Sequence, residues 1–168
     1  MVNGKLEGKG KYIYENGEYY EGEWKNDLRN GKGIEYYSNG NIKYKGDYVN
    51  DKREGNGKYI YENNEYYIGQ WRNNLCHGKG IEYYSNGKIK YEGEYIKGQR
   101  EGKGKYIWEN DEYYIGQWKN GLRCGEGEEY YSNGNIKYDG EYVNDKYEGN
   151  GKYIWENGEY YIDNGKMV

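Results

Sequence analysis

The stretch Tyr20-Glu-Gly-Glu-Trp24 decides how the rest of the chain is interpreted, because close copies of it return along the sequence. The copies are 24, 23, 24, 23 and 24 residues apart and begin at Tyr20, Tyr44, Tyr67, Tyr91, Tyr114 and Tyr138. A fixed period of this length is typical of repeat architectures, in which short units stack on their neighbours. The spacing predicts a single domain over residues 1–168, with about seven repeats of which the first and last are incomplete.

The composition favours an ordered chain without a deep aliphatic core. The 168 residues include 27 Tyr and 29 Gly, and neither Phe nor Pro. A mean hydropathy of -1.45 with 32% charged residues is typical of disorder, but disordered chains carry few aromatic residues and this chain has 19%. Tyr and Trp rings bury much apolar area against a thin partner surface. We therefore expect the rings to stabilise the fold.

Within each repeat, Tyr, Trp and Gly alternate with polar residues, and clusters of Asn, Asp and Gly lie at the two ends of these alternating stretches. This period of two indicates β-strands joined by tight turns, and no stretch carries a helical period. Tyr20, Gly22 and Trp24 then share one face of a strand, and Glu21 and Glu23 share the other. Glycine weakens a strand, so its recurrence beside aromatics predicts that a ring from the neighbouring strand lies over it. The predicted fold class is all-β.

The sequence Tyr20-Glu-Gly-Glu-Trp-Lys-Asn26, followed by Gly31-Lys-Gly33 and an Asn-Gly turn, resembles the MORN (membrane occupation and recognition nexus) repeat. The resemblance covers about residues 3–162, and copies such as Tyr91-Glu-Gly-Glu-Tyr95 are similar to a MORN variant repeat. It implies an elongated single-layer antiparallel β-sheet of stacked hairpins with an aromatic-lined groove. It also implies a non-catalytic role in docking partner proteins, in self-association or in membrane attachment.

A single-layer sheet cannot cover its aromatic face with a second layer, so we expect these rings to stay partly exposed and to form a binding groove. The alternative is that the rings only pack on one another as a thin core; we expect the inner atoms to stabilise the sheet and the outer edges to form the groove. The predicted groove residues are Tyr20, Trp24, Tyr44, Tyr48, Tyr67, Trp71, Tyr91, Tyr95, Tyr114, Trp118, Tyr138 and Tyr142. The first functional hypothesis is a protein–protein interaction scaffold that docks a protein or peptide.

Binding to anionic phospholipid, as a peripheral membrane module, is the second and weaker hypothesis. It needs several basic residues together on one surface, but Asp47 follows Lys43 and Lys45 on the same face. A net charge of -4 argues against nucleic acid as a partner. Stacking of sugars on the rings is a third alternative.

Residues for catalysis, metal or cofactors are not found in a convincing arrangement. His77 is the only histidine, so neither a histidine-based triad nor a multi-histidine metal site can form, and we expect a structural role for it in a turn. Cys76 and Cys124 occupy nearly equivalent turn positions about four strands apart, roughly 19 Å, which is too far for a disulfide. We expect free thiols, no cofactor and no enzymatic activity.

The chain begins without an apolar signal segment and has no apolar run long enough to span a bilayer. We expect a cytoplasmic protein, with a position at the periphery of a membrane or cytoskeletal structure left open. The end strands of an open sheet present unpaired backbone groups. We therefore expect either a homo-oligomer, formed through an edge or the aromatic face, or a terminal segment that covers the edge.

Overall fold

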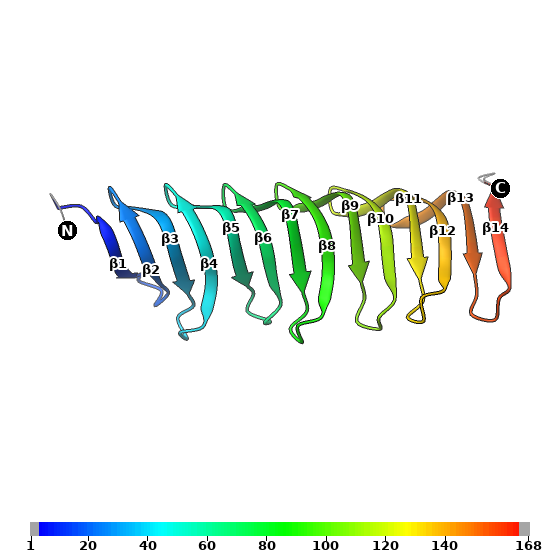
Figure 1. The fold of residues 1–168 in the computed structure, drawn as a ribbon, viewed down its shortest axis with the longest axis horizontal. Coiled ribbons are helices and arrows are strands. Elements are labelled where there is room, and N and C mark those ends of the chain that lie inside the picture. Colours follow the sequence, from blue (N-terminus) through cyan, green and yellow to red (C-terminus); the bar gives the residue numbers. More distant parts are fainter. Residues whose placement is uncertain (1–3, 165–168) are drawn as a thin grey trace. The chain divides into compact units, whose positions relative to one another are not determined.

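The computed structural model describes residues 4–164, which contain fourteen β-strands and no helix (Figure 1). The chain divides into two compact units, Met1–Lys88 and Ile89–Val168, and each is considered by itself. In each unit, the strands form an antiparallel sheet and lie in the order of the sequence. The predicted all-β class and the predicted antiparallel hairpins are therefore confirmed, while the single domain over residues 1–168 stays a prediction.

Each unit contains seven strands of five to nine residues. Those of the first unit are β1 (Gly8–Ile13), β2 (Tyr19–Lys25), β3 (Leu28–Tyr36), β4 (Ile42–Val49), β5 (Lys52–Ile60), β6 (Tyr66–Arg72) and β7 (Leu75–Tyr83). Those of the second unit are β8 (Ile89–Ile96), β9 (Gln99–Ile107), β10 (Tyr113–Lys119), β11 (Leu122–Tyr130), β12 (Ile136–Val143), β13 (Lys146–Ile154) and β14 (Tyr160–Asn164).

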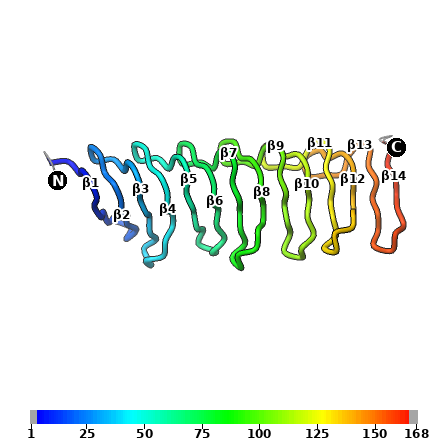
Figure 2. The backbone as a smooth tube through the Cα atoms, viewed as in Figure 1, coloured from blue at the N-terminus to red at the C-terminus, as the bar shows by residue number. Residues whose placement is uncertain are grey.

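Two kinds of turn join the strands and keep their pairing constant (Figure 2). Asn26 and Asp27 form a two-residue turn with φ angles of 51° and 68°, and two successive positive φ angles are typical of a type I′ hairpin. The other kind has five residues, as in 14–18, where the Gly17 N–H donates to the Tyr14 carbonyl at 2.9 Å. Because both turns recur, equivalent residues of successive strands stay in register.

A row of glycines crosses each unit in this register. Each glycine is the direct Cα partner of the glycine on the next strand. The row of the first unit is Gly10, Gly22, Gly33, Gly46, Gly57, Gly69 and Gly80. That of the second unit is Gly93, Gly104, Gly116, Gly127, Gly140 and Gly151. Each unit therefore has a strip of bare backbone across its middle.

A tyrosine ring covers this strip on one face, which we call the aromatic face. A Cβ on Gly22 would lie 2.3 Å from Tyr20 Oη, and one on Gly33 would lie 2.2 Å from the same atom. The ring thus lies over a glycine of its own strand and over the paired glycine of the next. The expectation that a ring occupies the space of the absent Cβ is confirmed. The ring over Gly33 comes from the neighbouring strand, as predicted. The ring over Gly22 comes from the same strand as the glycine, so the prediction of a neighbouring strand is wrong there.

The twelve rings predicted to line a groove form the core instead. Their exposed fractions run only from 0% to 8%. Tyr20 packs edge-to-face against Trp24 and Tyr48, with ring centroids 5.1 and 5.2 Å apart, a geometry that stabilises aromatic pairs. The expectation that the outer edges of these rings are exposed is therefore wrong. Contact between the rings and a partner stays a prediction.

Candidate interaction surfaces

Arginine side chains cover the rings of the aromatic face. The Arg53 guanidinium carbon lies 4.9 Å from the centroid of Tyr44, 4.7 Å from that of Tyr59 and 5.7 Å from that of Trp71. Such contacts combine cation–π attraction with the packing of the aliphatic stem. Equivalent contacts are made by Arg29, Arg100 and Arg123. These side chains explain how a single sheet can bury its aromatic face without a second layer.

A carboxylate neutralises two of these arginines in the first unit. The two carboxylate oxygens of Glu35 bind Arg29 Nη1 and Arg53 Nη2. The three side chains are only 12%, 18% and 17% exposed, respectively. Asp51 Oδ1 also lies 3.2 Å from Arg29 Nε. The charges above the rings therefore stabilise one another, since a buried charge without a partner would be costly.

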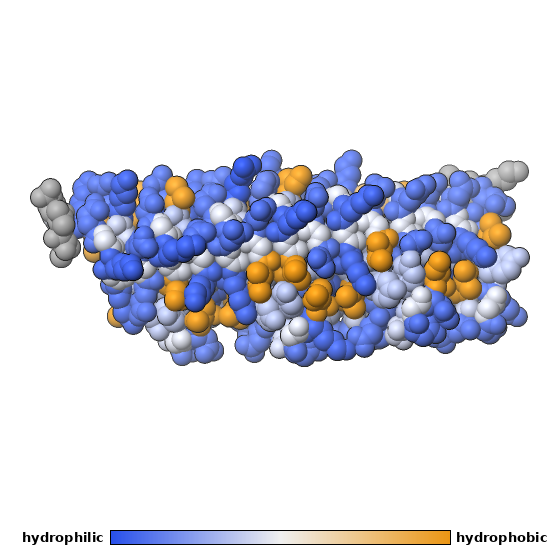
Figure 3. All heavy atoms as spheres, viewed as in Figure 1, coloured by the Kyte–Doolittle hydropathy of each residue, from blue (hydrophilic) through white to orange (hydrophobic). Residues whose placement is uncertain are grey.

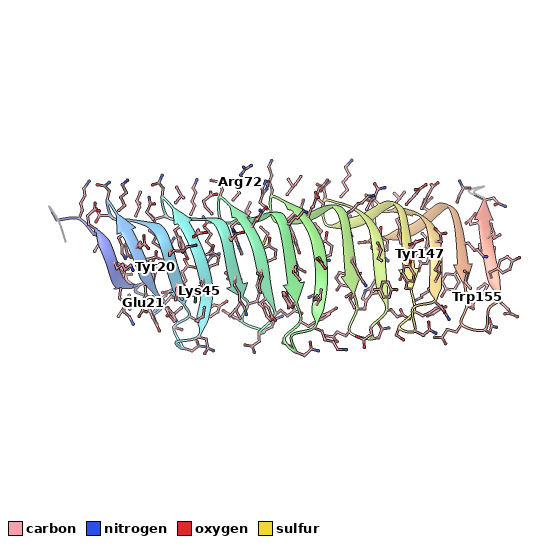
Figure 4. All side chains as sticks on the ribbon, in the orientation of Figure 1. Tyr20, Glu21, Lys45, Arg72, Tyr147 and Trp155 are labelled. Carbon is pink, nitrogen blue, oxygen red and sulfur yellow. The ribbon has the colours of Figure 1, made fainter. Side chains whose placement is uncertain are left out.

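The corresponding cluster of the second unit has a different composition. Glu129 is 6% exposed and lies 3.4 Å from Arg123 Nη1. It accepts hydrogen bonds from the Tyr142 hydroxyl at 3.1 Å and from the Tyr147 hydroxyl at 2.5 Å. Tyr147, labelled in Figure 4, is the second residue of β13, the position that Arg53 occupies in β5. A tyrosine hydroxyl thus replaces the second arginine.

This charged layer was not predicted from the sequence. Charged residues in a strand are usually interpreted as a solvent-exposed face, yet these arginines and glutamates share the face of the rings. The repeat does contain a sequence pattern from which this layer could have been predicted. Arginine is the second residue of β3, β5, β9 and β11, and glutamate recurs every 47 residues at Glu35, Glu82 and Glu129.

Burial also changes the ionisation of the core tyrosines. Removal from water raises the pKa of Tyr20 and Tyr114 to about 12, although Arg29 and Arg123 favour the phenolate and oppose the shift. Burial raises the pKa of Tyr48 and Tyr142 as well. The folded state therefore keeps these hydroxyls protonated where an unfolded chain would ionise, near pH 10.

We expect alkaline pH to destabilise the protein between about pH 10 and 12. The unfolded chain loses protons there while the folded chain keeps them, so each such tyrosine lowers the free energy of unfolding by up to roughly 1.4 kcal/mol per pH unit. Denaturation midpoints at pH 9, 10 and 11, with phenolate absorbance, would measure the slope. Tyr20→Phe removes one of these groups and should make the slope shallower. Equal midpoints at pH 9 and 11 would contradict the expectation.

The cysteines and the histidine lie in strands and not in turns, which corrects the sequence analysis. Cys76 and His77 belong to β7, and Cys124 belongs to β11. Cys76 is opposite Trp71 and Cys124 is opposite Gln117, so the two cysteines are at different positions of the repeat. Both are free thiols, as expected. Burial raises the pKa of Cys76 to about 12, which makes it a poor nucleophile.

The opposite side of each sheet is open, and we call it the glycine face. We define it by the residues directly before and after each position of the glycine row, where the strand alternation directs side chains away from the rings. In β14 this position is occupied by Asp163, which pairs with Gly151. In the first unit these are Lys9, Lys11, Glu21, Glu23, Lys32, Ile34, Lys45, Asp47, Asn56, Lys58, Ile68, Gln70, Lys79 and Ile81. In the second they are Glu92, Glu94, Lys103, Lys105, Ile115, Gln117, Glu126, Glu128, Asp139, Glu141, Asn150, Lys152, Ile162 and Asn164.

A groove runs over the glycine face of the first unit. Its volume is about 860 Å³, and its floor includes the backbone of five glycines of the row. Its walls include Lys45, Lys58, Ile34 and Ile68, and Ile68 is 41% exposed. Figure 3 shows apolar residues gathered in patches among hydrophilic ones, and Figure 4 labels Glu21 and Lys45 of this groove. The groove can therefore offer backbone, apolar and charged contacts together.

The two glycine faces differ in charge. That of the first unit has six lysines and three carboxylates, and that of the second has three lysines and six carboxylates. Within single strands the polar face is of mixed sign, as predicted from the sequence, and the difference in charge appears only in the sum over each half of the chain.

An array of β-hairpins of this kind, with recurring rings, arginines and glycines at fixed positions, defines a β-repeat protein. The model of the MORN repeat matches residues 1–19, 20–42, 44–66, 67–89, 91–112, 114–136 and 138–160. The chain therefore belongs to the MORN-repeat family, which confirms the resemblance seen in the sequence.

Other comparisons add little about function. No curated protein matches this chain. A solved structure described as "SAS-4 (dCPAP) TCP domain in complex with a Proline Rich Motif of Ana2 (dSTIL) of Drosophila Melanogaster" is similar, with 19% identity and a TM-score of 0.43. The likeness covers 92% of this chain and 88% of that one, but at this TM-score it has no bearing on the partners of this chain.

Residues 4–164 contain neither a metal-binding cluster nor a membrane-spanning helix. No group of His, Cys, Asp and Glu side chains there is arranged to bind a metal ion. That part of the chain also contains no helix with the length and apolarity needed to cross a bilayer.

Proposed function

We propose that this protein is a non-catalytic interaction scaffold and that its glycine faces make the partner contacts. Membership of the MORN-repeat family supports a repeat scaffold. The burial of the aromatic rings supports the choice of face, because rings exposed by 8% or less offer little area to a partner. The glycine face of the first unit, in contrast, has exposed isoleucine and lysine side chains around a groove.

The observation that supports this proposal most is the bare backbone floor of the groove. Five strands contribute Gly10, Gly22, Gly33, Gly46 and Gly57 to it. The side-chain positions of these glycines point to the aromatic face, so on the glycine face their backbone lies between the flanking side chains and a partner can contact it. Apolar walls with a few polar groups are typical of binding grooves. We propose that a protein or peptide segment lies along this row.

Affinity capture from the native host would test the proposal with two matched variants. Ile68→Glu places a charge in the groove wall, and Val49→Glu places the same charge at the end of β4, on the same side of the sheet but not among the residues that line the groove. The two residues are similarly exposed, at 41% and 50%. We expect Ile68→Glu to reduce recovery of the partner at least tenfold and Val49→Glu to leave it unchanged.

Recovery that is the same with both variants, when both are folded, would contradict the proposal. Recovery that falls only when the buried rings are disturbed, for example in Trp71→Ala, would instead favour the aromatic face.

Binding to anionic phospholipid is a second candidate function, favoured by the excess of lysine on the first glycine face. Vesicles with and without anionic lipid would test it. Binding through these lysines should require anionic lipid, weaken in Lys45→Glu and disappear at about 0.5 M salt, where screening is strong. Binding to neutral vesicles, or binding that is unchanged at that salt concentration, would rule out this mode.

A further inference from the structure

We infer that the basic glycine face of the first unit binds the acidic glycine face of the second unit in another copy of this chain. The inference rests on the proposed function, since it assigns a specific occupant to the same surfaces. Its basis is the opposite charge of two faces that otherwise share one layout.

The basic face retains lysines after its internal ion pairs are formed. Lys11 lies 3.1 Å from Glu21, and Lys32 lies 2.5 Å from Asp47. The remaining lysines lie on both sides of the glycine row, and three of them, Lys9, Lys45 and Lys79, are exposed. This excess extends from the first strand of the unit to the last, so a partner needs negative charge along the whole row.

The acidic face has the complementary excess. Among its carboxylates, Glu92, Glu126 and Asp139 are exposed and come from three different strands. One of its three lysines, Lys105, lies 4.0 Å from the centre of the Tyr113 ring on the same sheet. The face therefore presents mainly carboxylates to an approaching surface.

The layout of the two faces also matches. Each has fourteen flanking side chains on seven antiparallel strands, and neighbouring strands in any sheet are about 4.8 Å apart. Rows of lysines and carboxylates that repeat with the same spacing can meet along their length. Ile68 and Ile115, which are 41% and 42% exposed, add apolar area on the two faces.

Each copy offers both complementary faces. After one such contact, each copy still has one face free, so association can continue to further copies. Opposite charge steers such an encounter, and like charge prevents first units, or second units, from pairing with each other.

A pair of charge-swapped variants would test the inference. Lys9→Glu/Lys45→Glu/Lys79→Glu gives the first glycine face three lysines and six carboxylates. Glu92→Lys/Glu126→Lys/Asp139→Lys gives the second glycine face six lysines and three carboxylates. One variant then has two acidic faces and the other has two basic faces. Neither should associate with itself, but an equimolar mixture should.

Sedimentation velocity on the full chain would provide the readout. We expect wild type to associate at low salt and to become monomeric at about 0.5 M salt. Circular dichroism and thermal melting would show that each variant is folded. If a triple variant unfolds, the neutralised Lys45→Gln and Asp139→Asn variants should each still weaken association several-fold.

Wild type that remains monomeric at about 100 μM, where a complex of micromolar affinity would form, would overturn the inference. So would a mixture of the two swapped variants that stays monomeric, or association that both variants retain alone, which would indicate contact through strand edges. A monomer that binds an acidic peptide or anionic vesicles would assign the basic face to that occupant. Partner capture that still depends on Ile68 would preserve the scaffold proposal in each of these cases.

Discussion

Replacing Gly69 with valine is expected to destabilise the first unit by about 3 kcal/mol, the upper part of the range for overpacked cores. A Cβ at this position would lie 2.4 Å from Tyr67 Oη and 2.6 Å from the Gly80 Cα. The tyrosine ring would therefore have to leave its place, and the paired strand would have to move as well. Valine itself favours β-strands, so the loss would come from the collision.

Chemical denaturation of Gly69→Val, compared with Gly10→Val, would measure this effect. Gly10 belongs to the same glycine row, but the nearest atom to its absent Cβ is Trp24 Cδ1 at an ordinary 3.7 Å. Lys58→Val, on the glycine face, is a second control. Hydrogen exchange should increase mainly in β6 and β7, because repeat arrays open locally. Equal losses of stability in the three variants would show that contact with a tyrosine ring does not determine which positions of the glycine row tolerate a side chain.

The predictable part of this fold is the part that local chemistry determines. The 23- and 24-residue spacing indicated repeated hairpins, and alternation around Tyr20 assigned the two faces of each strand. Glycine beside tyrosine indicated that a ring needs the space of the missing Cβ. Each of these inferences depends on residues that are neighbours in sequence or in one hairpin, so the pattern was sufficient.

The exposure of the rings could not be predicted in the same way. Whether Tyr44 is a groove wall or core depends on Arg53, which comes from the next strand and lies over the ring. A long charged side chain can extend to solvent or lie along an apolar surface, and its residue type alone does not distinguish the two. The rings were therefore expected to stay partly exposed, because a single-layer sheet has no second layer to cover them.

The charged layer over the rings should be as important as the rings themselves. Glu35→Gln is expected to destabilise the first unit by about 3 kcal/mol, since it leaves Arg29 and Arg53 largely buried with no carboxylate between them. Glutamine keeps the size of the side chain, so the loss would reflect charge and hydrogen bonding more than an empty space. Chemical denaturation at neutral pH would measure it.

Glu129→Gln is the matched comparison, because Glu129 occupies the same position of the repeat 47 residues later. It has one arginine partner, and its other two partners are the hydroxyls of Tyr142 and Tyr147, which an amide oxygen can still accept from. We expect a loss of about 1 kcal/mol there. If the two losses were equal, the second arginine would not explain the importance of Glu35. A double variant Arg53→Met/Glu35→Gln should lose less than the sum of its single changes, because it no longer leaves Arg53 buried without a carboxylate partner.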